Sequence, residues 1–281
     1  MNPPSLTQPW AAEPLVTALA AMAAVCFVQG FLRLRRRGRK DHAPWTRAAL
    51  FSTGLALLVL PLVSPLDELA DRYLLSAHML EHVLIADAAI ALILVSLRGP
   101  LLYFAVPESL LRALGHKRWL RGAAAWLIRP KVALIAWAAA FGLWHIPAAY
   151  DYAARHPIAH DLEHASFLFA GLLVWTILVD PARHGSVSRG RRLAMIVVLF
   201  ALGTAIADVL IFSPTTLYPF YADQPHRAFG LSPLRDQQLA GLVMLVEQAL
   251  TLGTCAALLL WPELKARRRA RLQLGAEQPA T

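Results

Sequence analysis

Charged residues and cysteines are scarce in this sequence. Charged residues make up 16% of the 281 residues, whereas hydrophobic residues make up 57%, and the mean hydropathy is +0.49. The core of a water-soluble domain cannot absorb that much apolar surface, which excludes a soluble globular protein. Both cysteines, Cys26 and Cys255, lie in apolar runs without a second cysteine nearby. This excludes a disulfide framework and a thiolate metal site, so any metal must be bound by histidine, methionine or carboxylate.

Lysine and arginine are absent from residues 1–13. No small-x-small cleavage site follows the first apolar run either, so we expect this run to remain in the mature protein as a span rather than to act as a cleaved signal peptide. The net charge of +9 comes from basic residues in short segments between apolar runs. Membrane topology explains this distribution better than a nucleic-acid partner does, and we expect no nucleic-acid partner.

Long apolar runs recur along the whole chain, separated by charged or Pro/Gly-bearing segments. A helix needs ~20 mostly apolar residues to cross a bilayer. The pattern therefore predicts one all-α, multi-pass membrane domain over residues 1–281, a bundle of seven transmembrane helices. The spans are predicted near residues 14–32, 46–63, 74–97, 131–149, 160–179, 191–212 and 239–261.

The distribution of lysine and arginine predicts the orientation of the bundle. Twenty-three of the 27 basic residues lie in segments 33–47, 98–131, 180–192 and 263–281, which are alternate connections of the predicted bundle. Positively charged segments stay in the cytoplasm. We therefore predict an N-terminus outside, a C-terminus inside and a basic cytoplasmic tail over residues 263–281.

Two connecting segments are open to more than one interpretation. Residues 110–127 mix leucine and tryptophan with arginine and lysine, as in an amphipathic helix on the inner membrane face, but a solvated cytoplasmic loop is an equal alternative. Residues 213–238 form a predicted outer loop that is long enough to cap a site at the mouth of the bundle or simply to connect two helices.

Polar residues of the predicted spans gather at one depth. Ionisable groups are costly in a membrane and usually face the bundle interior, so a shared depth indicates a site. On spans three to seven, the residues near the outer end are His78, Met79, Glu81 and His82; His145; His160, Glu163 and His164; Asp208; and Met244 and Glu247.

Two histidine pairs, His78/His82 and His160/His164, have the i, i+4 spacing that places both rings on one helical face. Together with His145 they predict a metal or haem site, because neutral imidazole binds copper, zinc and iron. The structural alternative is that these histidines only form hydrogen bonds between helices.

Four carboxylates accompany the histidines. Glu81, Glu163, Asp208 and Glu247 could orient metal-bound imidazoles through hydrogen bonds or be interfacial acids without that role. Asp87 lies deeper, near the middle of the third span, where it is either protonated and hydrogen-bonded or part of a relay.

The methionines admit two roles as well. The thioether of Met79 could bind Cu(I), although methionine in an apolar helix more often serves packing.

Several ordered motifs resemble the membrane-embedded cytochrome c oxidase assembly factor CtaG family of the caa-type oxidase kind. They are Ser64-Pro-Leu-Asp67, Ser76-Ala-His-Met-Leu-Glu-His82, Trp144-His-Ile-Pro-Ala-Ala-Tyr-Asp151, His160-Asp-Leu-Glu-His-Ala-Ser-Phe167, Tyr218-Pro-Phe-Tyr221 and Asp236-Gln-Gln-Leu-Ala-Gly241, and the resemblance runs from about residue 45 to 262. The motif positions that could bind metal are His78, Met79, His82, His145, His160 and His164. The sequence departs from the family pattern at Asp87, an unexpected carboxylate, and in lacking a proline between Asp87 and Arg98.

The resemblance implies a protein of the bacterial inner (plasma) membrane that is needed to make active haem-copper oxidase. We expect a non-enzymatic assembly factor that binds copper at the histidine cluster and delivers it to an oxidase subunit, from a partly solvent-accessible site under the 213–238 loop. A zinc-dependent membrane hydrolase, with three histidines and Asp208 around the metal, is one alternative. A b-type haem protein with axial histidines from two helices is another.

Overall fold

The computed structural model describes residues 13–225 and 228–276. Helices make up 84% of the structure, and the described residues contain no strand. The predicted all-α class is therefore confirmed.

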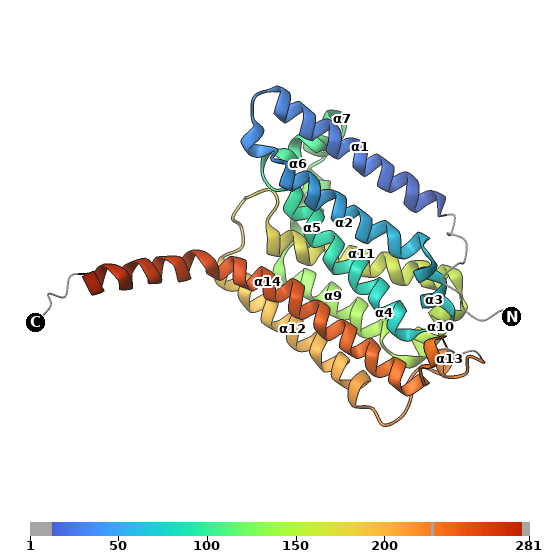
Figure 1. Cartoon of the computed structure of the whole chain (residues 1–281). Coiled ribbons are helices and arrows are strands. Elements are labelled where there is room, and N and C mark those ends of the chain that lie inside the picture. The colour runs from blue at the N-terminus through green and yellow to red at the C-terminus, as the bar shows by residue number, and fades with distance from the viewer. Residues whose placement is uncertain (1–12, 226–227, 277–281) are drawn as a thin grey trace, which may run out of the picture.

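Most of the long helices run side by side through the bundle (Figure 1). They are α1 (Pro14–Arg36), α2 (Trp45–Val63), α9 (Pro130–Trp144), α11 (Pro157–Val179), α12 (Arg189–Phe212) and α14 (Pro233–Ala276). One further long rod consists of α4 (Leu75–Val83), a π-helical turn (Leu84–Ala88) and α5 (Ala89–Leu97).

Short helices connect the long ones. They are α3 (Pro65–Arg72), α6 (Pro100–Ala105), α7 (Glu108–His116), α8 (Arg118–Leu127), α10 (Pro147–Arg155) and α13 (Pro219–Ala222), with 3₁₀ turns at Lys40–His42 and Ala228–Gly230. Helices α3, α10 and α13 gather at one end of the bundle, which we call the site end, and α6 and α7 lie at the opposite end (Figure 1).

Six helices among the described residues are long and apolar enough to cross a membrane. A seventh span results if α8 and α9, which are bent by 68° relative to each other, form one broken span. The protein is thus a multi-pass membrane protein. The number of seven spans and the N-out orientation remain predictions.

Helix α9 ends five residues before the end of the fourth predicted span, residues 131–149. Helix α9 has 15 residues and ends at Trp144. The break arises because Pro147 disfavours helical backbone at the preceding residue, and Ile146 accordingly has the extended angles φ −68° and ψ 123°. The chain then turns into the separate helix α10.

Helix α14 contains the seventh predicted span, residues 239–261, and extends beyond it at both ends. Helix α14 begins at Pro233 and continues through the basic segment after residue 262 as far as Ala276. The last part of the predicted tail, residues 277–281, lies outside the described residues.

Most of residues 110–127 are helical, which is compatible with the amphipathic alternative. They lie in α7 and α8, where Leu110, Trp119 and Trp126 are exposed. Exposed apolar side chains beside basic residues are typical of a helix at a membrane surface.

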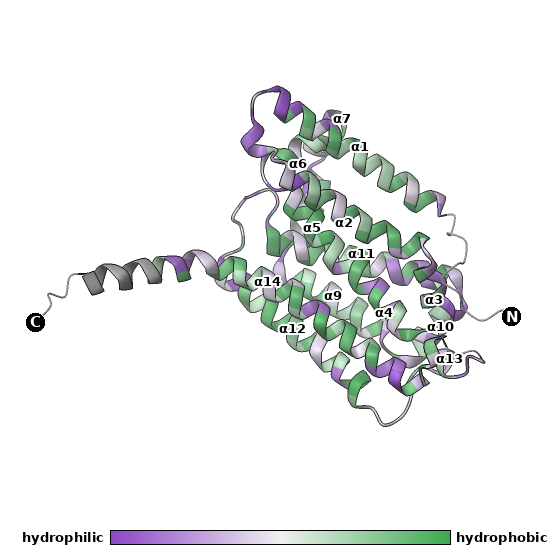
Figure 2. Cartoon of the chain, viewed as in Figure 1, coloured by the Kyte–Doolittle hydropathy of each residue, from purple (hydrophilic) through white to green (hydrophobic). Residues whose placement is uncertain are grey.

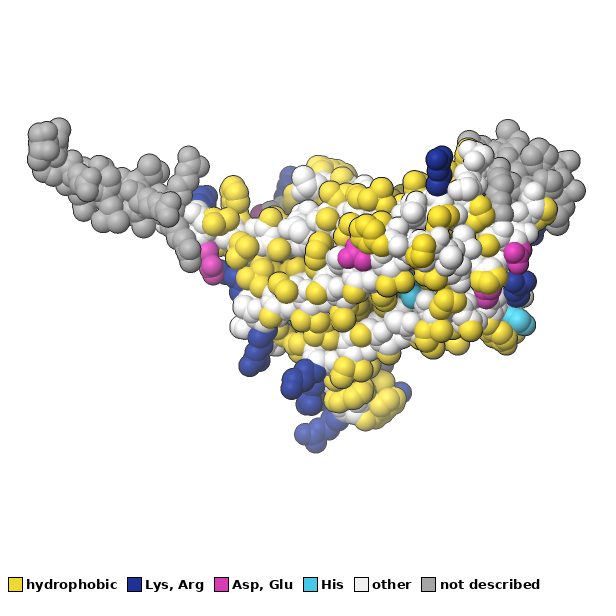
Figure 3. All heavy atoms as spheres, turned by 90° about the horizontal axis from the view of Figure 1, so that it is seen from below, with side chains coloured by type: hydrophobic (Ala, Val, Ile, Leu, Met, Phe, Trp, Pro, Cys, Tyr) yellow, Lys and Arg dark blue, Asp and Glu magenta, His cyan; other side chains and the backbone are white. Residues whose placement is uncertain are grey.

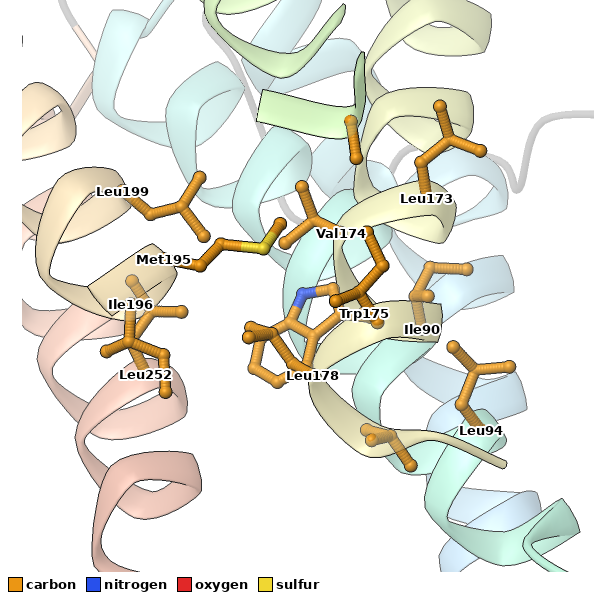
Figure 4. Close-up of a cluster of buried hydrophobic side chains, with 13 residues drawn as sticks. Ile90, Leu94, Leu173, Val174, Trp175, Leu178, Met195, Ile196, Leu199 and Leu252 are labelled. Carbon is orange, nitrogen blue, oxygen red and sulfur yellow. The ribbon is translucent and has the colours of Figure 1, made fainter. Parts of the chain in front are cut away.

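The rod α4–α5 and helix α11 occupy the centre of the bundle. In the most apolar 18-residue segment of each, 50% and 56% of the segment is buried, against 17% in α1, α2 and α14. Away from the site end, Trp175 and Leu178 of α11 pack against Met195 and Leu199 of α12 and against Ile90 of α5 (Figure 4). The most buried helices are thus the ones that carry the predicted histidine pairs.

The flanks of the bundle are apolar. Hydrophobic residues run along the outer helices (Figure 2), and apolar side chains are spread over the face shown in Figure 3. Ile135, Val197 and Leu250 are each at least 65% exposed. Such a surface is expected of helices that face lipid.

Candidate metal centre

Four histidines from two helices meet at the site end. His78 and His82 come from α4, and His160 and His164 come from α11. One ring nitrogen of each lies within 4.8 Å of those of the other three. The ring centroids are 4.2 Å apart within each pair, and 5.1 Å separates His78 from His160. We call this set the four-histidine group; both predicted pairs belong to it.

Asp236 of α14 positions the first turn of α4. Its carboxylate accepts hydrogen bonds from the backbone N–H of Leu75 (2.7 Å) and of Ser76 (3.1 Å), and from the Ser76 hydroxyl (2.5 Å). Backbone N–H groups at a helix start have no partner within the helix, so a carboxylate at this place stabilises the helix. The cap fixes α4 relative to α14 two residues before His78.

Helix α11 approaches the rod closely just below the histidines. Gly171 faces the π-helical turn, and a Cβ atom at this position would lie 2.1 Å from the carbonyl oxygen of Ala86. Only a residue without a side chain permits this approach. The turn begins directly after Val83. The contact of Gly171 with the turn therefore determines the position of the histidine-bearing part of α4 relative to α11.

Hydrogen bonding determines which nitrogen of His78 faces the group. The hydroxyl of Tyr221 donates to the carbonyl of Ala70 (2.6 Å), and its oxygen lies 2.9 Å from Nδ1 of His78. The oxygen therefore accepts the Nδ1–H, and Nε2 of His78 keeps its lone pair. Orientation of a ligand imidazole by a hydrogen bond to its other nitrogen is usual at metal sites.

Several ring nitrogens of the group are buried without hydrogen bonds. Nε2 of His78, both ring nitrogens of His82 and Nε2 of His164 have no hydrogen-bond partner in the described part of the chain. His78 is 1% exposed and His82 is 4% exposed. Buried polar atoms without partners are costly, and a metal ion would satisfy several of them at once.

The fifth candidate ligand, His145, stands outside this group. Its Nδ1 donates to the carbonyl of Phe141 (2.7 Å), and its Nε2 is buried without a hydrogen-bond partner in the described structure. The ring of Phe167 contacts both His145 (6.4 Å between centroids) and His82 (4.8 Å). The structure thus brings together the histidines of α4 and α11. His145, which follows the last residue of α9, lies beside them.

The sixth candidate, Met79, belongs to an apolar cluster. It is 1% exposed and packs with Leu75, Val83 and Tyr150. This environment fits the packing role of a buried methionine.

The four candidate carboxylates separate in the structure. Glu163 is 1% exposed, and its Oε1 lies 3.9 Å from Nε2 of His82, beside the four-histidine group. Glu81 instead joins Asp67 and Asp71 of α3, with one oxygen of each within 4.8 Å of the others. We call these three residues the acidic trio.

Asp208 and Glu247 belong to neither set. Asp208 is half-buried on α12. Glu247 lines a small cavity of about 30 Å³ together with Asp87. Asp87 accepts a hydrogen bond from Nε1 of Trp175 (2.8 Å), which fits the hydrogen-bonded alternative for this deep residue.

The acidic trio is crowded enough to change proton affinities on α3. Burial, together with the nearby carboxylates of Asp71, Glu13 and Glu68, raises the pKa of Asp67 to about 7. Burial also raises the pKa of Asp71, although His160 and Arg72 act in the opposite direction. Burial disfavours an unpaired carboxylate, and like charges add to the cost.

Comparison with known proteins agrees with the motifs. A family model described as cytochrome c oxidase caa3 assembly factor (Caa3_CtaG) matches residues 25–265. The chain belongs to this family. No curated protein and no solved structure matches the chain. The matched range includes the four-histidine group and the acidic trio, so both lie within the part of the assembly factor that defines the family.

The 213–238 loop of the assembly factor covers the group, as the capping alternative predicted. Tyr221 of α13 contacts His78, and the hydroxyl of Tyr218 donates to the carbonyl of His145 (3.1 Å). Gln237 secures the loop by accepting from the N–H of Leu217 (2.7 Å). Residues 226–227 of this loop lie outside the described structure.

A cavity of about 820 Å³ opens beside the four-histidine group of the assembly factor. Side chains of α3, α10 and α11 line it, and the site-end parts of α1 and α2 contribute apolar residues. His78, His160 and His164 reach its wall, and the last two are only half-buried. The cavity thus connects three histidines of the group with the surface of the bundle.

Three residues that shape the site received no role from the sequence. Asp71 lies 3.5 Å from Nε2 of His160, Tyr221 orients His78, and Asp236 caps α4. Tyr221 and Asp236 lie in motifs that resemble those of the caa3 assembly factor family, and this position in a motif was the sequence feature that could have indicated their roles. For Asp71, the signal was its i, i+4 spacing from Asp67.

Proposed function

We propose that this assembly factor binds copper at the four-histidine group and delivers it to a subunit of a haem-copper oxidase in the bacterial inner membrane. The family match supports the role in oxidase assembly. Copper as cargo, the oxidase subunit as recipient and the inner membrane as location extend that role.

The observation that carries the proposal is the set of buried imidazole lone pairs without partners. Imidazole is a good copper ligand, and metal–nitrogen bonds are ~2 Å long, so two ligands on opposite sides of an ion lie ~4 Å apart. The four nitrogens already lie within 4.8 Å of one another. Small side-chain movements would therefore bring them to an ion.

Delivery also requires that the cargo can leave. The 820 Å³ cavity is lined by the half-buried His160 and His164 and by the more deeply buried His78, whereas the buried His82 does not line it. This difference in burial supports release of the copper ion on the α11 side, with the histidines of α4 as the last ligands to dissociate.

The alternatives require arrangements that fit these residues less well. A zinc hydrolase that uses Asp208 would need this carboxylate near the histidines, and Asp208 is not part of the four-histidine group. A b-type haem needs its axial imidazoles on opposite faces of a flat macrocycle. Between the two helices, the rings of His82 and His164 and those of His78 and His160 pack edge to face, with centroids 4.9 Å and 5.1 Å apart, which leaves no space between them for one.

Metal binding to the purified full-length protein tests the proposal. We expect the wild type to bind copper and the double variant His78→Ala/His164→Ala to lose it, with the copper spectrum of the oxidase missing from cells that carry this variant. His156→Ala is the matched control, because His156 lies at the same end of the bundle but is exposed and outside the group.

Three results would overturn the copper proposal. They are a wild type that binds no copper, a double variant that binds it like the wild type, and bound zinc with esterase or amidase turnover. A visible haem spectrum of the purified protein would favour the remaining alternative.

A further inference from the structure

The acidic trio is a second cluster of potential ligands at the site end. Asp67 and Asp71 lie one helical turn apart on α3, and Glu81 reaches them from α4. One oxygen of each carboxylate lies within 4.8 Å of those of the other two. The three acids thus converge from two helices on one point.

No basic side chain of the described structure forms an ion pair with Asp67 or Glu81. The nearest arginine in sequence, Arg72, pairs with Glu68 instead, at 3.7 Å. The imidazole of His160 approaches Asp71 alone, at 3.5 Å. Three carboxylates without a cation repel one another, which is costly in a partly buried site.

Glu81 provides an independent indication of a ligand. It is 0% exposed, and neither of its carboxylate oxygens has a hydrogen-bond partner within the described residues. Buried carboxylates are normally paired or coordinate metals. Here the unpartnered side chain points at the two aspartates of α3, so a cation at that point would satisfy all three groups.

We propose that Asp67, Asp71 and Glu81 bind a hard divalent cation of the Ca²⁺ class, at a site separate from the four-histidine group. Oxygen-only ligands select such ions, whereas imidazole favours copper or zinc. Ca²⁺–oxygen bonds of 2.3–2.6 Å place opposite ligands up to roughly 5 Å apart, which accommodates the observed spread of 4.8 Å. The cation joins α3 to α4, and water molecules complete its coordination.

The two sites adjoin through one side chain. Asp71 is a ligand of the proposed cation and also faces His160 of the four-histidine group. The cation therefore holds Asp71 in place beside a histidine that faces the cavity. This inference depends on the carboxylates alone and does not require that the histidines bind copper.

Binding of Mn²⁺ to the purified full-length protein, followed by electron paramagnetic resonance and competed with Ca²⁺, tests the site. We expect one Mn²⁺ per chain, displaced by Ca²⁺, and at least a tenfold loss of affinity in Glu81→Gln and in Asp67→Asn. Asp161→Asn is the matched control, because Asp161 is exposed on the wall of the same cavity but is not part of the trio.

Two further measurements separate this proposal from the copper proposal and from misfolding. The double variant His78→Ala/His164→Ala should keep Mn²⁺ binding. Glu81→Gln should keep copper binding, which also shows that it is folded. A wild type that binds no Mn²⁺ at millimolar concentration, or a Glu81→Gln variant that binds it like the wild type, overturns the cation site and leaves the copper proposal intact. Protonated carboxylates would then be the explanation for the trio.

Discussion

At the scale of single residues, the chemistry of the four-histidine group depends on which imidazole nitrogen carries the proton. Tyr221 accepts from Nδ1 of His78 and thereby turns its Nε2 toward the group. The carbonyl of Phe141 has the same effect on His145, at the edge of the group. In the proposed copper site, these two groups would leave Nε2 of each ring free to bind the ion.

Removal of the Tyr221 hydroxyl should weaken metal binding. In Tyr221→Phe, Nδ1 of His78 loses its acceptor and the ring is no longer held in one tautomer. Partners of this kind typically contribute 10–100-fold to metal affinity, so we expect a loss of that size in copper competition with a chelator. Tyr152→Phe is the control, because Tyr152 is 57% exposed on α10. Equal affinities in both variants would contradict the role of Tyr221.

Residue types and spacing were sufficient to predict the two histidine pairs, because an i, i+4 relation is a local property of a helix. They were not sufficient for Glu81, for which both a role beside the histidines and that of an interfacial acid were open. It turns to Asp67 and Asp71 because α3 folds back against α4. Such a contact between elements leaves no local pattern in the sequence.

At the scale of elements, the site depends on how closely α11 can approach the rod of α4 and α5. The rod contains a π-helical turn at Leu84–Ala88. The sequence lacks the proline expected in this helix, so it did not predict whether or where the helix bends. Gly171 allows α11 to contact this turn at Ala86. The two histidine pairs project from these two helices, so their separation follows from this contact.

A methyl group at Gly171 should therefore force the two helices apart. We expect Gly171→Ala to lower the free energy of unfolding by about 1–3 kcal/mol, the usual cost of overpacking, and to weaken copper binding. The matched control is Gly142→Ala on α9, where an added Cβ meets no atom within 4 Å. There the better helix propensity of alanine should leave stability unchanged or raise it by up to about 1 kcal/mol. Denaturant unfolding in detergent measures both, and equal effects would refute the contact as a determinant.

At the scale of the whole molecule, the four-histidine group, the acidic trio and the capping loop all lie at one end of the bundle. Basic segments 33–47, 98–131 and 180–192 connect the helices at the other end, which predicts that the site faces the outside of the cell. A recipient on that side could reach the cavity without crossing the membrane.

Labelling of single cysteines in intact cells checks this orientation. In a chain with Cys26→Ala and Cys255→Ala, we expect His156→Cys to react with a membrane-impermeant maleimide. His184→Cys should react only after the membrane is permeabilised. Both positions are exposed, so accessibility depends on the side of the membrane alone. The reverse pattern would show that the site faces the cytoplasm.

The sequence by itself determined the class of the molecule and the faces of its helices. Apolar length and the 3.6-residue period are properties of contiguous chain, so the membrane spans and the pairs His78/His82 and His160/His164 could be derived without a fold. Only the tertiary structure decided which pairs meet, that His145 stands beside them, and that Glu81 faces α3. These outcomes depend on packing between helices far apart in the chain, where one glycine contact or one carboxylate cap sets the position of a whole element.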